Sequence, residues 1–245
     1  MTASGGERRA AATPRYLAIA AQLRDRIVVD QLGPHTLLPS ERELAEQHRV
    51  SRMTARQALS LLESEGVVYR RPPRGTFVAE PRVRFHVGSF SEEVSRLGRH
   101  PAARLLWAEV QEPTPSVRLA LDLDDGASVH AFHRLRTVDD VPFALETTFL
   151  PVDLTPGILE LADEGSLWAT LRDHYGIALT RSTAVLESIV LDDSSSAQLN
   201  VRPGSAGTLL TRTTFGAGER RVEFARDVYR ADRASFEVTV DLSGP

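Results

Sequence analysis

Apolar side chains recur every three or four residues in the first part of the chain, which is the spacing of amphipathic helices. This spacing predicts helices over 15–30, 41–48 and 52–64. Ser40 precedes the second helix and, with the glutamate three residues later, has the spacing of a capping box. Ser51 precedes the third helix and is a good N-cap, and a glycine follows the first and the third helix as a stop signal.

From position 67 onward the hydrophobic period changes to that of strands. Residues 67–78 predict two short strands around a turn, and the polar residues 79–84 predict a linker. Residues 1–13 are small and polar without a period, which favours a disordered arm before a first domain over 14–78.

The remaining residues, 85–243, alternate between short strand patterns and a few helical ones. Strands connected mostly by hairpins predict an α+β domain with an antiparallel sheet. The strands are predicted at 103–111, 127–137, 142–150, 183–191, 207–215, 221–230 and 235–242, and the helices near 115–121, 166–175 and 193–200.

The predicted third helix has two different faces. Arg52, Arg56 and Ser60 lie four residues apart on one face, while apolar residues occupy another. Guanidinium groups on such a face can read base edges, because the fork of Arg can bind O6 and N7 of guanine together. This layout is typical of the recognition helix of a helix-turn-helix. For an isolated helix, the alternative is an ordinary solvated face.

Two further features favour contact with DNA. Ser51 and Thr54 lie at the N-terminus of the third helix, where hydroxyls and free N–H groups suit a phosphate. The strand–turn–strand that follows carries Arg70, Arg71 and Arg74 near its turn, where Gly75 allows close backbone approach. The pattern therefore predicts a winged helix-turn-helix whose wing lies along a groove or on phosphates.

Charge and composition change this picture in two ways. The 245 residues carry a net charge of −4, but residues 1–80 hold 12 Arg against 9 acidic residues, whereas the remainder holds 17 against 24. A local basic region on an acidic protein still indicates nucleic-acid binding.

The chain has no Cys, which excludes disulfides, thiol nucleophiles and thiolate metal sites. No apolar run approaches the ~20 residues that span a bilayer, and the N-terminus has no signal pattern, so we expect a cytoplasmic, nucleoid-associated protein without a membrane partner.

The segment 38–78 resembles the winged-helix domain of GntR-type bacterial transcription regulators. The motifs PSER, VSR-x-T-x-R, AL-x-x-L, the EG stop and GTFV occur in this order. The resemblance implies double-stranded DNA as a partner, with contacts at Arg42, Ser51, Arg52, Thr54, Arg56, Arg74 and Gly75.

In the C-terminal part, the segment HRLRTVDDVPFALETTFLP predicts a hairpin that turns at Asp139-Asp140. Arg134 and Arg136 alternate onto one face of the first strand, and Glu146 falls roughly opposite Arg134 on the second. A buried sheet face cannot hold such charges unless they are paired or meet a ligand.

A second segment, RRVEFARDVYRADR, also alternates. Its charged face holds Glu223, Ala225, Asp227 and Tyr229, and its other face holds Val222, Phe224 and Val228. Two guanidinium groups and two carboxylates on sheet faces suit a small anionic, hydroxylated molecule. From the residues alone, an internal salt-bridge network or an exposed sheet face is an equally good interpretation.

This part of the chain is similar to the UTRA effector-binding domain of the HutC-type GntR subfamily. The similarity is carried by SFSEEVSRLG, the RLR segment, VPFALETTFLP and VEFARDVYRADRASF. It implies a chorismate-lyase-like fold that is not enzymatic as a rule. Because members bind amino-sugar phosphates, urocanate or fatty acids, it implies an anion without naming it. The implied effector-binding positions are Phe90, Ser91, Arg134, Arg136, Glu146, Ser166, Glu223 and Tyr229.

We therefore expect a ligand-responsive transcription regulator, most simply a repressor that a small anionic effector, a sugar phosphate or a carboxylate, releases from its operator. A homodimer on a near-palindromic operator is expected, because a single winged helix rarely gives enough affinity.

The alternatives to a ligand-responsive regulator are a lyase-like enzyme tethered to a DNA-binding domain and an architectural protein without a ligand. No nucleophile–base pair or metal set stands out, so we expect no catalytic residue, no metal and no cofactor. The effector, the operator, the direction of regulation and the strand of the dimer contact remain open.

Overall fold

The fold is that of a computed structural model, which describes residues 14–161 and 165–239. The chain divides into two units, Met1–Pro81 and Arg82–Pro245, and each is described by itself. The arm predicted over 1–13 lies outside the described residues. No helix of the described residues is long and apolar enough to cross a membrane.

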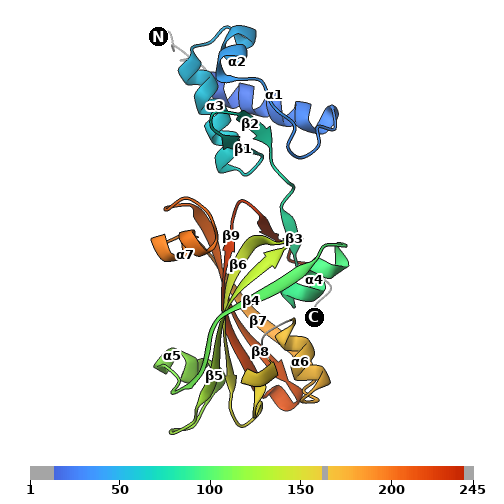
Figure 1. The fold of residues 1–245 in the computed structure, drawn as a ribbon, viewed down its shortest axis with the longest axis vertical. Helices are drawn as coiled ribbons and strands as arrows, with labels where there is room; N and C mark the ends of the chain where they lie inside the picture. Colours follow the sequence, from blue (N-terminus) through green and yellow to red (C-terminus); the bar gives the residue numbers. More distant parts are fainter. Residues whose placement is uncertain (1–13, 162–164, 240–245) are drawn as a thin grey trace, which may run out of the picture. The chain divides into compact units, whose positions relative to one another are not determined.

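The N-terminal unit contains three helices and a two-stranded hairpin (Figure 1). Its elements are α1 (Arg15–Val29), α2 (Glu41–His48), α3 (Arg52–Ser64), β1 (Val68–Arg71) and β2 (Gly75–Val78). Ser40 and Glu43 form the predicted capping box, in which each side chain bonds the other residue's backbone N–H. The Ser51 hydroxyl accepts from the N–H of Thr54, so the predicted cap of α3 is confirmed.

A small apolar core holds this unit together. It combines residues from all three helices and both strands, including Leu23 of α1, Leu44 of α2, Leu62 of α3 and Val78 of β2. Gly75 opens β2 with a φ of +121°, and a Cβ at this position would lie 2.8 Å from the Leu37 side chain. The turn of the hairpin therefore needs glycine there.

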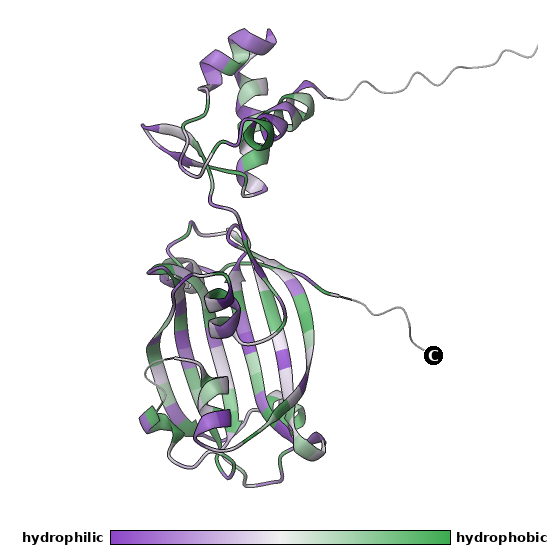
Figure 2. Ribbon diagram, turned by 90° about the vertical axis from the view of Figure 1, so that its right-hand side faces the viewer, coloured by the Kyte–Doolittle hydropathy of each residue, from purple (hydrophilic) through white to green (hydrophobic). Residues whose placement is uncertain are grey.

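The C-terminal unit is built on a six-stranded antiparallel sheet with the order β4-β5-β6-β9-β8-β7. Its strands are β4 (Pro101–Gln111), β5 (Val129–Val138), β6 (Val141–Pro151), β7 (Leu179–Val190), β8 (Ala206–Gly216) and β9 (Arg221–Arg230). The predicted turn is confirmed, since Asp139 and Asp140 join β5 to β6 with φ of 48° and 64°. Figure 2 shows how hydrophobic and hydrophilic residues alternate along these strands.

Short helices cover both faces of the sheet. They are α4 (Phe90–Arg96), α5 (Pro115–Leu121), α6 (Leu167–Asp173) and α7 (Asp193–Gln198), with 3-10 turns at Ile158–Leu161 and Ala217–Glu219. Leu171 of α6 belongs to the same apolar cluster as Phe132, whereas Val117 of α5 belongs to that of Ala131, the residue before Phe132 on β5. Because neighbouring residues of a strand point to opposite faces, α6 and α5 lie on opposite sides of the sheet. In Figure 1, α4 lies on the side of α6, and α7 on the side of α5.

Two predictions about this unit need correction, and one helix was missed. The linker predicted over 79–84 runs into β3 (Val83–Phe85), because Val83 and Phe85 are buried in an aromatic cluster. β3 pairs in parallel with β10 (Ala234–Phe236), which is much shorter than the strand predicted over 235–242; the last residues of that range lie outside the described ones. Helix α4 was not predicted.

Candidate functional site

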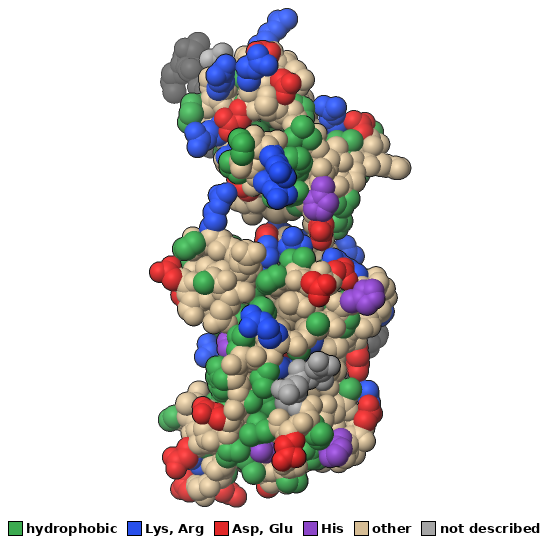
Figure 3. Space-filling view, viewed as in Figure 1, with side chains coloured by type: hydrophobic (Ala, Val, Ile, Leu, Met, Phe, Trp, Pro, Cys, Tyr) green, Lys and Arg blue, Asp and Glu red, His purple; other side chains and the backbone are tan. Residues whose placement is uncertain are grey.

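The face of α3 that carries Arg52, Arg56 and Ser60 is exposed, as predicted. The side chains of Arg52 and Arg56 lie on the surface, while Ala55 and Leu59 are buried in the core of the unit. Arg side chains stand out from this unit in Figure 3. Two acidic residues lie near this surface: Glu41 Oε1 is 4.0 Å from Arg56 Nε, and Glu46 Oε1 is 4.0 Å from Arg42 Nη1.

The three arginines of the hairpin differ in position. Arg71 and Arg74 are exposed near the turn, together with Gly75. Arg70 instead folds back onto α3, where Nη2 donates to the Arg56 carbonyl at 3.1 Å and to Ser60 Oγ at 3.0 Å. The expected cluster of three arginines at the wing tip is therefore wrong for Arg70, because its strand position directs it toward the helix.

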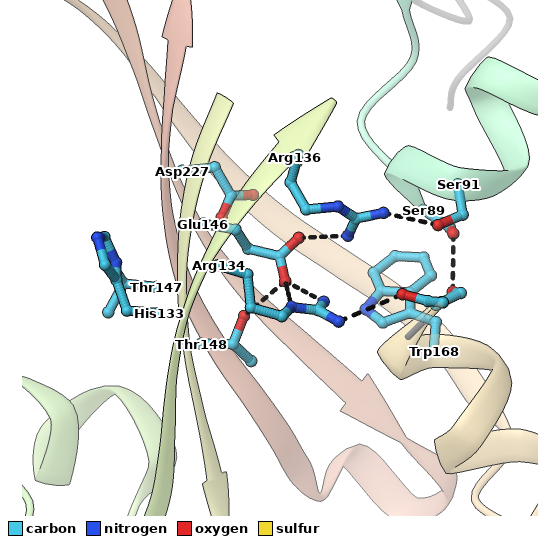
Figure 4. Close-up of polar contacts among 12 residues, drawn as sticks. Ser89, Ser91, His133, Arg134, Arg136, Glu146, Thr147, Thr148, Trp168 and Asp227 are labelled. Carbon is cyan, nitrogen blue, oxygen red and sulfur yellow. Dashed lines mark hydrogen bonds and ion pairs between the residues drawn. The ribbon is translucent and has the colours of Figure 1, made fainter. Parts of the chain in front are cut away.

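The second candidate site is a set of charged side chains on the sheet face that α4 and α6 cover (Figure 4). We call Arg134, Arg136 and Glu146 the β5–β6 cluster, and Arg212, Glu223 and Asp227 the β8–β9 cluster. All six residues are buried, so the alternative of an exposed sheet face is wrong.

The β5–β6 cluster is an arginine–glutamate–arginine bridge. Arg134 lies directly opposite Glu146 in the strand register, as predicted, and donates from Nε to Oε1 at 3.1 Å. Arg136 donates from Nη1 to Oε2 of the same carboxylate at 2.8 Å. Burial alone would raise the pKa of Glu146, but the two guanidinium groups outweigh it and lower the pKa to about 2. At neutral pH the cluster therefore carries one surplus positive charge.

The β8–β9 cluster surrounds Glu223 with donors. Its Oε2 accepts from Thr214 Oγ1 at 2.6 Å and from Trp168 Nε1 at 2.9 Å, and its Oε1 accepts from Arg212 Nη2 at 3.3 Å. The Arg212 guanidinium lies over the Trp168 ring, 4.9 Å from the centroid. Asp227 is 3.7 Å from Arg212 across the strands. Burial raises the pKa of Asp227 to about 8, against the opposing charge of Arg212.

Residues 88–91, which follow β3 and include the start of α4, are tied to this face at three points. Arg212 Nη1 donates to the Gly88 carbonyl at 3.2 Å, and Arg136 Nη2 donates to Ser91 Oγ at 2.7 Å. Ser89 Oγ lies 3.2 Å from Ser166 Oγ at the start of α6. The same arginines that form the clusters thus hold the segment that follows β3.

The structure places the remaining predicted effector residues in different roles. Phe90 is buried, and the Arg136 guanidinium lies 4.5 Å from the centroid of its ring. Tyr229 is buried among aromatic rings, and burial raises its pKa. Ser166 caps α6 through the N–H of Ala169. A pocket of about 470 Å³ lies beside α6 and is open to the surface, and Ser166 is the one predicted effector residue in its lining.

Sequence reasoning missed Arg212 and Trp168. Arg212 is the one charged residue of β8, whose other residues are apolar or carry hydroxyls, and this isolated charge was the available signal in the sequence. The sequence carries no signal for Trp168, because its indole contacts Glu223, which is 55 residues away in the chain. Among the described residues, no group of His, Asp and Glu could hold a metal ion. Asp122 ends α5 in the left-handed conformation.

Comparisons with known proteins agree with this architecture. Residues 15–78 match the bacterial regulatory proteins of the gntR family, and residues 96–235 match the UTRA domain. The chain is 34% identical over 226 residues to the HTH-type transcriptional repressor NagR of Bacillus subtilis (strain 168), covering 91% of this chain and 93% of the relative. It is 37% identical over 237 residues to the HTH-type transcriptional repressor PhnF of Mycolicibacterium smegmatis, covering 93% and 94%.

A solved structure shows the same fold. The crystal structure of PhnF from Mycobacterium smegmatis superposes with a TM-score of 0.66 at 33% sequence identity, covering 92% of this chain and 100% of that one. The predicted α+β architecture, a helix-turn-helix followed by an antiparallel-sheet domain, is confirmed. The chain belongs to the GntR family of DNA-binding bacterial regulators, in which it joins the family's helix-turn-helix domain to a UTRA domain.

Proposed function

We propose that this protein is a repressor that binds a near-palindromic operator as a homodimer and leaves it when a small anionic metabolite occupies the C-terminal unit. The observation that carries the proposal is the surplus positive charge of the β5–β6 cluster, buried beneath two helices. A buried surplus charge is costly unless a counter-charge meets it. An anionic group, a phosphate or a carboxylate, supplies that counter-charge.

The contacts of residues 88–91 support a route from the effector to the operator. An anion on Arg136 competes with Ser91 for its guanidinium, and this segment continues backwards through β3 to the short linker after β2. A ligand changes DNA binding only if it prefers one arrangement of the chain over another. We propose that the effector selects the arrangement in which the linker does not present both winged helices to the operator.

Proposed contacts with DNA come from the exposed side chains of α3 and the wing. Arg52 and Arg56 would read base edges, whereas Arg42, Ser51, Thr54, Arg74 and Gly75 would position the backbone on phosphates. NagR and PhnF, which the chain matches over more than nine-tenths of its length, are transcriptional repressors, which supports repression over activation.

The test uses the operator-bound protein. Metabolite phosphates and carboxylates are titrated against a preformed complex with the protein's own promoter, and release is followed by gel shift. We expect Arg134→Ala to keep operator affinity while losing release, and Arg52→Ala to lose operator affinity by about 1–3 kcal/mol while the fold stays intact. Release of Arg134→Ala at the wild-type concentration would place the anion elsewhere and leave the β5–β6 cluster a structural salt bridge.

A further inference from the structure

The β8–β9 cluster contains two buried polar atoms that have no hydrogen-bond partner among the described residues. They are Nε of Arg212 and Oδ1 of Asp227. Both side chains are more than nine-tenths buried, and Arg212 Nη1 is 3.7 Å from Asp227 Oδ2. Native proteins leave few such atoms without a partner, so each one needs an explanation.

The missing partners are confined to this half of the site. In the β5–β6 cluster, every guanidinium nitrogen donates a hydrogen bond: those of Arg134 to Glu146 and Gly165, and those of Arg136 to Glu146, Ser91 and Ala102. Glu223, beside Arg212, uses both of its oxygens. The unmet pair is therefore a local feature of Arg212 and Asp227.

The chemistry of the pair defines its complement. Arg212 Nε–H requires an acceptor, and Asp227 Oδ1 requires a donor, or an acceptor when it carries the carboxyl proton. A hydroxyl group supplies both. An ammonium group supplies donors only and would lie beside the guanidinium of Arg212, so it leaves Nε unmet and adds a like charge.

We propose that Arg212 and Asp227 are specificity-determining residues that select an effector with a hydroxyl group, and reject one with an amine, at the position next to the β8–β9 cluster. The inference rests on the proposed function, in which the anionic group of the same effector lies on the β5–β6 cluster. Glu146 is directly opposite Asp227 in the strand register, so the two clusters adjoin on one sheet face and one small molecule can span them.

The electrostatics of Asp227 support this selection. Burial raises its pKa to about 8, Glu146 and Glu223 add to the rise, and Arg212 and Arg136 oppose it. The Tyr229 hydroxyl, whose pKa burial also raises, adds no charge at neutral pH. Burial therefore favours the neutral form of the Asp227 carboxyl group. A neutral carboxyl group exchanges hydrogen bonds readily with a hydroxyl but offers no counter-charge to an ammonium group.

The experiment compares four probes by calorimetry with the full-length protein at pH 7. Sorbitol 6-phosphate has a hydroxyl at every carbon that the phosphate does not occupy, hexyl phosphate has none, 6-aminohexyl phosphate ends in an amine, and inorganic phosphate reports the anion site alone. We expect sorbitol 6-phosphate to bind at least about tenfold more tightly than hexyl and 6-aminohexyl phosphate, the effect of one charge-assisted hydrogen bond.

Asp227→Leu, of similar volume, should remove this preference and leave affinity for inorganic phosphate unchanged. Asp227→Asn, which keeps the amide oxygen as an acceptor, should retain it, and Asp153→Leu is the surface control.

The outcomes separate this inference from the proposed function. If none of the four probes binds, the proposed anion site is wrong, and the inference fails with it. If all four bind with equal affinity, the anion site stands and the selection by Arg212 and Asp227 is wrong. If the preference for sorbitol 6-phosphate survives in a folded Asp227→Leu protein, a buried water satisfies the pair and the residues are structural. The wild-type comparison decides the ligand chemistry even if Asp227→Leu fails to fold.

Discussion

At the scale of single residues, Glu146 determines whether the sheet face can hold two buried arginines. Each of its oxygens accepts from a different guanidinium group, and neither Arg134 nor Arg136 has another carboxylate partner in the described part of the chain. Removing one partner of a buried ion pair leaves an uncompensated charge, which costs far more than the pair contributes when intact.

We therefore expect Glu146→Gln to lower the free energy of unfolding by about 3–5 kcal/mol, measured by urea denaturation. Glu219→Gln is the matched control, because it breaks the ion pair between Glu219 and Arg181, which lies on the surface. Surface ion pairs contribute at most about 1 kcal/mol. Equal effects of the two substitutions would show that the β5–β6 cluster is open to solvent.

Asp227 makes a pH-dependent contribution of the opposite sign to that of an ordinary salt bridge. Its pKa is about 8 in the folded chain and near 4 when unfolded, so between these values only the folded protein holds the proton. Stability from this residue is complete below about pH 4 and falls as the pH rises to about 8. Glu146 acts in reverse, since its lowered pKa contributes stability that is lost below about pH 4.5.

We expect Asp227→Asn, which cannot ionise, to flatten the decline of the melting temperature between pH 5 and pH 8. The melting temperature of the variant relative to that of the wild type should therefore rise steadily from pH 5 to pH 8. The check is thermal unfolding at half-unit pH intervals with Asp153→Asn as the exposed control. A difference between Asp227→Asn and wild type that does not change with pH would mean that Asp227 is already ionised in the folded chain.

At the scale of elements, sequence patterning predicted what depends on neighbouring residues. The capping box at Ser40, the cap at Ser51 and the turn at Asp139-Asp140 are local signals, and the structure has all three. What failed depends on distant pairing: β3 is three residues long and pairs with β10, about 150 positions away. The same contrast holds within the site. The predicted hairpin correctly placed Glu146 beside Arg134, because the two strands are neighbours in sequence. The partners of Arg212 lie on β9 and α6, which only the fold brings next to β8.

The wing offers a prediction at this scale, because Arg70 and Arg74 lie on one hairpin but have different surroundings. Arg74 is exposed, so its loss should reduce the slope of log affinity for DNA against log salt by about one. Arg70 holds β1 to α3 through Ser60 and the Arg56 carbonyl, with Glu41 and Glu63 nearby. Arg70→Ala should lower the melting temperature of the winged helix and leave the salt slope unchanged. A reduced slope in Arg70→Ala would make it a phosphate contact instead.

At the scale of the whole molecule, the proposed homodimer needs a surface, and β7 is the best candidate in the described sheet. It is an edge strand of 12 residues, and Val185 and Val190 on it are 59% and 75% exposed. Natural proteins rarely leave a long edge strand with exposed apolar side chains uncovered, because it pairs with other chains. A second copy is the partner that a twofold operator demands.

We expect the double substitution Val185→Glu and Val190→Glu to convert the dimer into a folded monomer, measured by sedimentation. Operator affinity should then fall toward that of the isolated fragment 1–81, which has its own core, because the tether between two winged helices is lost while every base contact is kept. Trp107→Glu and Val110→Glu on β4, the opposite edge of the sheet, are the matched control. If only the β4 variant dissociates, the dimer forms through that edge; if neither does, the contact lies outside both edge strands.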